Sequence, residues 1–196
     1  AIPVGPAGAT EKFDELALTA IAELPYHWRI ESRDDAPRVS GAYTNAEANT
    51  TYANAAGSPR DAGSYTFSSS AAYDQAVGGL SSSNAAKTVT VSAKFMNAAN
   101  QPLHRWTVRY AVEKYRNGTV SSAVRLLCSL DGESWTAVGA PTAFAADADT
   151  NGYAADARPG ATVSVERQAA FDAPITTGGV FYLAWQIAAA ESEDSA

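Results

Sequence analysis

The chain has 196 residues, of which 46% are hydrophobic and 18% are charged, and its formal net charge is −7. The low share of charged residues argues against disorder, and the length suits a single domain with a sizeable core. The negative charge disfavours nucleic acids and acidic membrane surfaces as partners, and no apolar run in the sequence is long enough to span a bilayer.

The composition also indicates the cellular compartment of the protein. Cys128 is the only cysteine, so the chain can form neither an internal disulfide nor a CxxC metal site. We expect Cys128 to be a small buried hydrophobe, with a reactive thiol as the alternative. Abundant Ala, Ser, Thr, Asn and Gly with little Lys predict an exported bacterial protein, either secreted or at the cell surface.

The N-terminal third shows the least regular pattern. Residues 12–18 predict a strand or a short helical turn, and residues 27–31 predict a short strand. We predict that residues 32–62 are a long irregular loop, which is either the rim of a ligand site or a plain surface loop. We expect flexible ends at residues 1–10, which are rich in Pro and Gly, and at the acidic residues 190–196.

Two long strands dominate the rest of the chain. Apolar side chains occupy every second position from Trp106 to Val112 and from Val124 to Leu130, which is the pattern of strands with one face in a core. We predict that these strands are neighbours joined by a turn at Asn117-Gly118. Further strands are predicted at residues 63–69, 76–80, 87–96, 135–138, 161–167 and 180–187.

Many strands, turn residues between them and almost no helical pattern predict an all-β fold. We expect an antiparallel β-sandwich, and its long crossover loops favour a jelly-roll-like topology. We expect residues 1–196 to form one β-sandwich domain.

Several motifs in order resemble a known family. They are Phe13-Asp14-Glu15-Leu16, the stretch 63–69, Glu113-Lys-Tyr-Arg-Asn-Gly118, the stretch 129–135 and the stretch 181–185. Together they resemble the jelly-roll domain of large exported bacterial surface proteins, which often carry a surface-sorting tail or adjoin adhesin or nuclease modules.

This resemblance implies an exported, non-catalytic domain. The sequence departs from the family at Tyr115, where Trp is usual, and at Ala184, where Arg is usual. It also lacks the Ile-Asp-Asp strand with which the family normally closes. We therefore expect an unpaired strand edge, which invites strand addition or dimerisation.

The candidate ligand site is the outward face of the strand that begins near Trp106. Polar and aromatic side chains on such a face suit the flat ring of a sugar. The alternative is a face that is merely solvated or packed on another domain. The candidate ligand-binding residues are Arg105, Arg109, Glu113, Tyr115 and Tyr182.

The candidate metal site lies in the stretch 147–156. Oxygen ligands at alternate positions before a glycine resemble the first half of a calcium loop, although the closing glutamate is absent. We expect no required cofactor; a structural Ca²⁺ is the option that this stretch leaves open, and a solvated acidic loop is the alternative. The candidate ligands are Asp147, Asp149, Asn151 and Asp156.

These observations favour a non-catalytic extracellular binding or adhesion module over an enzyme. Carbohydrate is the favoured ligand class, and a surface protein is the other partner considered. A structural spacer in a larger surface protein is the first alternative. A polysaccharide hydrolase or lyase is the second, but Glu113 has no clear carboxylate mate and His27 and His104 are the only histidines.

Overall fold

The computed structural model describes residues 1–16, 23–32, 37, 51–52, 63–68, 75–81, 88–146, 152–153 and 160–189. Within these residues all regular structure is β, with fourteen strands and no helix. The strands are β1 (Ile2–Val4), β2 (Trp28–Ser32), β3 (Thr51–Tyr52), β4 (Gly63–Ser68), β5 (Gln75–Leu80), β6 (Thr88–Asn97), β7 (Leu103–Lys114), β8 (Arg116–Asn117), β9 (Ser122–Ser129), β10 (Thr136–Ala137), β11 (Thr142–Phe144), β12 (Gly152–Tyr153), β13 (Ala161–Ile175) and β14 (Val180–Ala189).

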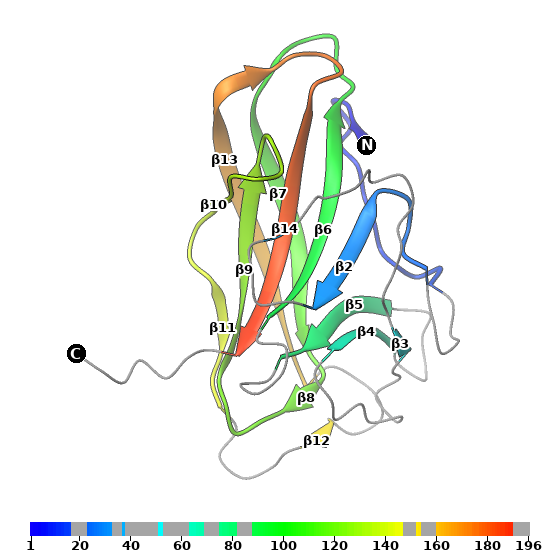
Figure 1. Cartoon of the computed structure of the whole chain (residues 1–196), viewed down its shortest axis with the longest axis vertical. Coiled ribbons are helices and arrows are strands. Elements are labelled where there is room, and N and C mark those ends of the chain that lie inside the picture. Colours follow the sequence, from blue (N-terminus) through cyan, green and yellow to red (C-terminus); the bar gives the residue numbers. More distant parts are fainter. Residues whose placement is uncertain are drawn as a thin grey trace, which may run out of the picture.

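The strands form an antiparallel β-sandwich, which confirms the predicted fold class. The larger layer has the order β1-β6-β14-β9-β10, with β2 also paired to β6 and β11 also paired to β9. The opposite layer is the long β7–β13 pair, and Figure 1 shows it behind β9, β14 and β6. The chain crosses between layers from β6 to β7 and again from β13 to β14, as expected of a jelly-roll-like topology.

Two smaller sheets lie at one end of the sandwich. The first has the order β3-β4-β5, and the second pairs β8 with β12. Both are drawn at the lower end of the molecule in Figure 1.

The two long strands predicted as neighbours belong to different layers. β7 pairs with β13, whereas β9 pairs with β14. β8 and residues 118–121 carry the chain from one layer to the other, so Asn117-Gly118 does not close a hairpin between β7 and β9. The prediction of a neighbouring pair is therefore wrong. The predicted alternation is confirmed, because Trp106 and Val112 are buried while Arg105, Thr107 and Arg109 are exposed.

The core lies between the two layers and is rich in aromatic rings. Trp106 of β7 and Leu126 of β9 belong to one buried cluster, and Val112 and Val124 belong to the next. Trp28 stacks on Trp185 at 5.6 Å between ring centroids. Burying each such side chain contributes roughly 1.5–3 kcal/mol to folding.

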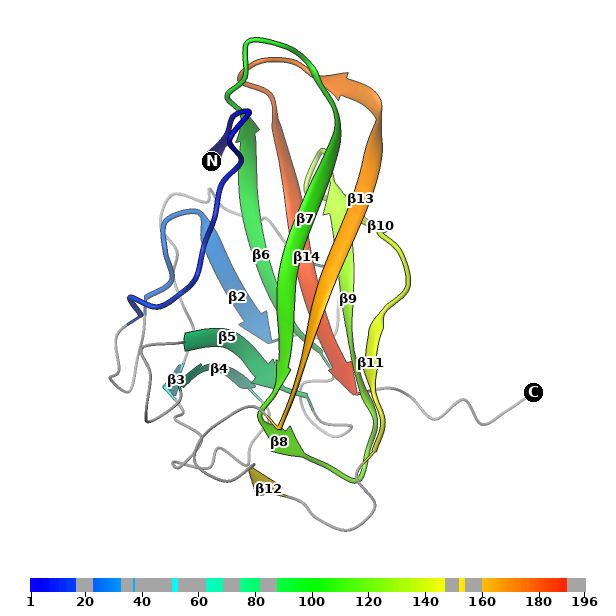
Figure 2. The same cartoon turned by 180° about the vertical axis from the view of Figure 1, so that it is seen from behind.

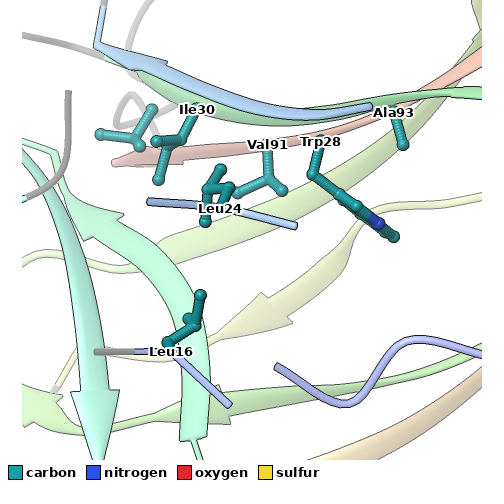
Figure 3. Packing of buried hydrophobic residues seen from close by; sticks show 7 residues of the cluster. Leu16, Leu24, Trp28, Ile30, Val91 and Ala93 are labelled. Carbon is teal, nitrogen blue, oxygen red and sulfur yellow. The ribbon is translucent and has the colours of Figure 1, made fainter. Parts of the chain in front are cut away.

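A further buried cluster closes the side of the sandwich beside β2. Figure 3 shows Ile30 and Trp28 on β2 next to Val91 and Ala93 on β6, with Leu24 and Leu16 on their core side. The backbone N–H of Leu16 donates to the carbonyl oxygen of Phe13 at 3.2 Å across a turn at Asp14-Glu15, so residues 12–16 are not a strand; residues 17 and 18 of the predicted stretch lie outside the described residues. Although residues 1–10 predict a flexible end, Ile2–Val4 pair in parallel with β6 as β1.

Candidate functional site

A cleft of about 1590 Å³ opens between the two layers beside β7. Its first wall is the unbroken run 106–116, which is most of β7 and the start of β8. Its second wall is formed by residues 7–14 and 25–28. Figure 2 shows β7 with β13 on one side, and the N-terminal segment with β2 and β5 on the other.

The floor of the cleft is apolar. Half-buried and buried side chains of β6 and β14 line it, and β5 lines its lower end. Concave sites with an apolar lining and a few polar groups are typical of ligand binding. The floor residues are Phe95, Phe181, Leu183, Trp185 and Ile187.

Two residues of the second wall have an unusual backbone. Phe13 has a φ of 62° and His27 a φ of 74°, a region that non-glycine side chains rarely adopt. Both line the cleft. Strained conformations cluster at functional sites, which favours the cleft as the site in this chain.

An exposed aromatic ring also lies on this wall. Tyr26 is 60% exposed, and its ring centroid lies 3.8 Å from that of His27. On the same wall, Phe13 packs edge-on against Trp28, with ring centroids 4.9 Å apart. The sequence analysis did not place these residues in a site, although Phe13 belongs to the motif 13–16 and His27 and Trp28 belong to the predicted strand 27–31.

The predicted arginines lie on the outer face of the β7–β13 layer, and both are exposed. The Nε atom of Arg109 donates to Oε2 of Glu166 at 2.6 Å, and Arg109 also lines the cleft. Hydrogen bonds from Gln168 and Arg109, together with the charge of Arg109, hold the pKa of Glu166 below its usual range. Because the Arg109 side chain is 75% exposed, this ion pair adds little stability.

Tyr115 does not join the arginines on the outer face. It is only 6% exposed and stacks on Phe67 of β4, with ring centroids 4.9 Å apart at an interplanar angle of 17°. Its hydroxyl donates to Oε2 of Glu113 at 2.7 Å. The expectation that Tyr115 presents an open ring is therefore wrong, because β4 covers the ring.

Tyr182 belongs to the opposite face of the molecule. Its neighbours Phe181 and Leu183 pack toward β7 in the core, so Tyr182 points away from the β7–β13 layer. It is 8% exposed, and Nζ of Lys94 lies 5.7 Å from its ring centroid. The structure thus does not bring Tyr182 together with Arg105 and Arg109.

The candidate calcium ligands Asp147, Asp149, Asn151 and Asp156 all lie outside the described residues. In the described part of the chain, no group of three or more His, Cys, Asp or Glu side chains could hold a metal ion. The predicted calcium site stays a prediction.

Cys128 lies in a region of intermediate burial on β9, facing the core near Trp106. Burial raises the pKa of its thiol to about 11. A thiol with this pKa is almost entirely protonated near neutral pH, which favours a packing role over a nucleophilic one.

The charges around the cleft differ from those of the whole chain. Of the described lining residues, four are cationic and three are carboxylates, a net charge of +1 against −7 for the chain. The cations are Lys12, Arg109, Lys114 and Arg116, and the carboxylates are Glu11, Asp14 and Glu113.

Comparison with known proteins finds no relative of this chain. No family model, no curated protein and no solved structure matches the chain. Among the described residues, no helix is both long and apolar enough to cross a membrane.

Proposed function

We propose that the chain is a non-catalytic extracellular binding or adhesion module whose ligand lies in the cleft beside β7. The cleft itself is the observation that carries this proposal. It combines a volume of about 1590 Å³ with an apolar floor, a rim of seven charged side chains and two residues of strained backbone. A structural spacer needs none of these features.

Carbohydrate is the ligand class that the proposal favours. Sugars bind where an exposed ring meets hydrogen-bonding groups, and Tyr26 offers such a ring on the cleft wall. Across the cleft, Glu113 and Arg116 offer a carboxylate and a guanidinium. This site replaces the outer face of β7, where Tyr115 is buried and Tyr182 is absent.

The location and origin of the protein belong to the same proposal. The motifs that resemble the jelly-roll domains of bacterial surface proteins support a secreted or surface-attached module, as does the composition. A surface glycan is the natural ligand in that setting.

A glycan array tests the proposal. We expect saturable binding to one glycan class, weakened about tenfold by Tyr26→Ala, because a stacked ring contributes about 1.4 kcal/mol. Leu130→Ala is the matched control, since Leu130 is 44% exposed and does not line the cleft. If the wild-type chain shows no saturable signal, or if both variants bind as the wild type does, carbohydrate in this cleft is ruled out.

A further inference from the structure

β7 is paired along one edge, and its other edge is open as far as the described residues show. It pairs with β13 over ten consecutive positions, from Arg105 to Lys114. No strand among the described residues pairs with its other edge, and that edge borders the cleft along residues 106–113. A strand edge of this length offers a row of unpaired N–H and C=O groups to another chain.

The far edge of the same layer is obstructed. Nη2 of Arg167 on β13 donates to the carbonyl oxygen of Ala140 at 2.9 Å. Gly139 lies so close that a Cβ there would meet the Arg167 side chain at 2.9 Å. Side chains and loops that cover an edge in this way prevent pairing with other chains. The open edge of β7 is therefore the one suited to strand addition.

The space beside β7 is bounded on its far side. Residues 7–14 and 25–28 form the second wall, and β6 and β14 form the floor. A slot with two walls and a floor admits one extended segment more readily than the edge of a second folded domain. In such a segment, every second side chain points into the cleft.

The residues along the slot define the chemistry of that segment. Inward side chains would meet Val108, Tyr110 and Trp185, so they should be apolar. Outward side chains would lie beside Thr107, Arg109 and Ala111. Arg109 binds Glu166 through Nε, and its Nη groups can still donate to a carboxylate or a small polar side chain at these positions. A second copy of β7 is the poorer fit, because it would bring another Arg105 and Arg109 to this edge.

We propose that the cleft receives an extended polypeptide segment of a partner protein, which adds to β7 as a further antiparallel or parallel strand. The segment alternates apolar residues with acidic or small polar ones and completes the smaller layer of the sandwich. This inference rests on the proposed function of a binding module with its ligand in this cleft, and it names a polypeptide in place of carbohydrate as that ligand.

The probe is an acetylated peptide of about nine residues, which spans most of β7 at about 3.3 Å per residue. In it, valine alternates with aspartate and threonine. We expect saturable binding by calorimetry, and a scrambled peptide of the same composition should bind at least tenfold more weakly. Two further peptides carry N-methyl groups on one or the other alternating set of amides. Exactly one of these sets should abolish binding, because a strand presents alternate amides to opposite edges.

Hydrogen exchange locates the contact. Peptide binding should slow amide exchange in the fragment that contains residues 105–113. Arg109→Glu should weaken binding about tenfold at low salt, whereas Arg125→Glu, an exposed arginine on β9 away from the cleft, should not.

The outcomes separate this inference from the proposed function. Glycan binding without peptide binding agrees with the proposed function and overturns the proposed addition of a strand to β7. Binding of the peptide without protection of β7, or equal binding by both N-methylated peptides, also overturns it. Failure of both ligands removes the proposed function as well. Self-association that protects the same β7 fragment would assign the edge to a second copy instead.

Discussion

At the scale of single residues, polar side chains with several hydrogen bonds fix the turns of this fold. Asp131 accepts hydrogen bonds from the backbone N–H groups of Ser134 and Glu133 at 2.7 and 2.8 Å, and from the Ser129 hydroxyl at 2.9 Å. The next residue, Gly132, has a positive φ of 78°, which the turn before Trp135 needs. The sequence could not show that Ser129 completes the network.

Asp131 should make part of the stability depend on pH. The three hydrogen bonds hold the pKa of its carboxyl well below its usual range. Because the folded pKa is the lower one, this stabilisation is complete above the ordinary value of about 3.9 and is lost as the pH falls below it. We expect urea midpoints between pH 5 and pH 2 to fall less for Asp131→Asn than for the wild type. Parallel curves for the two proteins would contradict this assignment.

At the scale of strands, alternation in the sequence predicted the elements better than their partners. Period-two patterns identified β6, β7, β9 and β14, because a strand with one face in the core must alternate. Pairing depends on where the connections lead. The short strands β8, β10, β11 and β12 carry too few residues to show a period, so the crossing between β7 and β9 was predicted as a hairpin.

A glycine in β5 permits one close approach between strands. A Cβ at Gly79 would lie 2.6 Å from the carbonyl oxygen of Gly63 and 2.6 Å from the methyl groups of Val89. Gly79→Ala should therefore destabilise the fold by about 1–3 kcal/mol through overpacking.

Urea unfolding followed by tryptophan fluorescence measures this effect. Gly5→Ala is the control, because a Cβ at Gly5 meets nothing within 4 Å. Equal midpoints for the two variants would show that β5 can move away from β4 and β6 without cost.

At the scale of the whole molecule, the sequence predicted the sandwich but not the site. The layers follow from hydrophobic alternation, which is a local property of each strand. The cleft follows from the absence of a described partner on one edge of β7 and from the path of residues 7–14 and 25–28, which no local pattern encodes. Arg109 and Glu113 line the cleft and could be predicted as site residues, because they follow the alternation of β7. Tyr26 and Phe13 also line it but could not be predicted, because they lie outside any periodic stretch.

The two layers are tied together at the end opposite the small sheets by Asn97, the last residue of β6. It is 1% exposed, and its Nδ2 donates to the carbonyl oxygens of Ile175 at 2.8 Å and Gln101 at 2.9 Å. Its Oδ1 accepts from the N–H of Ala99 at 2.9 Å. One side chain thus joins the β6–β7 connection to the end of β13, and so links the larger layer to the smaller one.

Asn97→Ala should cost about 2–3 kcal/mol, because it leaves the Ile175 carbonyl buried without its donor. Asn100→Ala, an exposed neighbour in the same connection, should change the free energy of unfolding by no more than about 0.5 kcal/mol. Urea unfolding gives both values, and hydrogen exchange adds the location. Faster exchange in β7 and β13 together, without a change in β9, is expected if Asn97 holds the smaller layer in place. Uniformly faster exchange across both layers would instead mean that the sandwich opens as one unit.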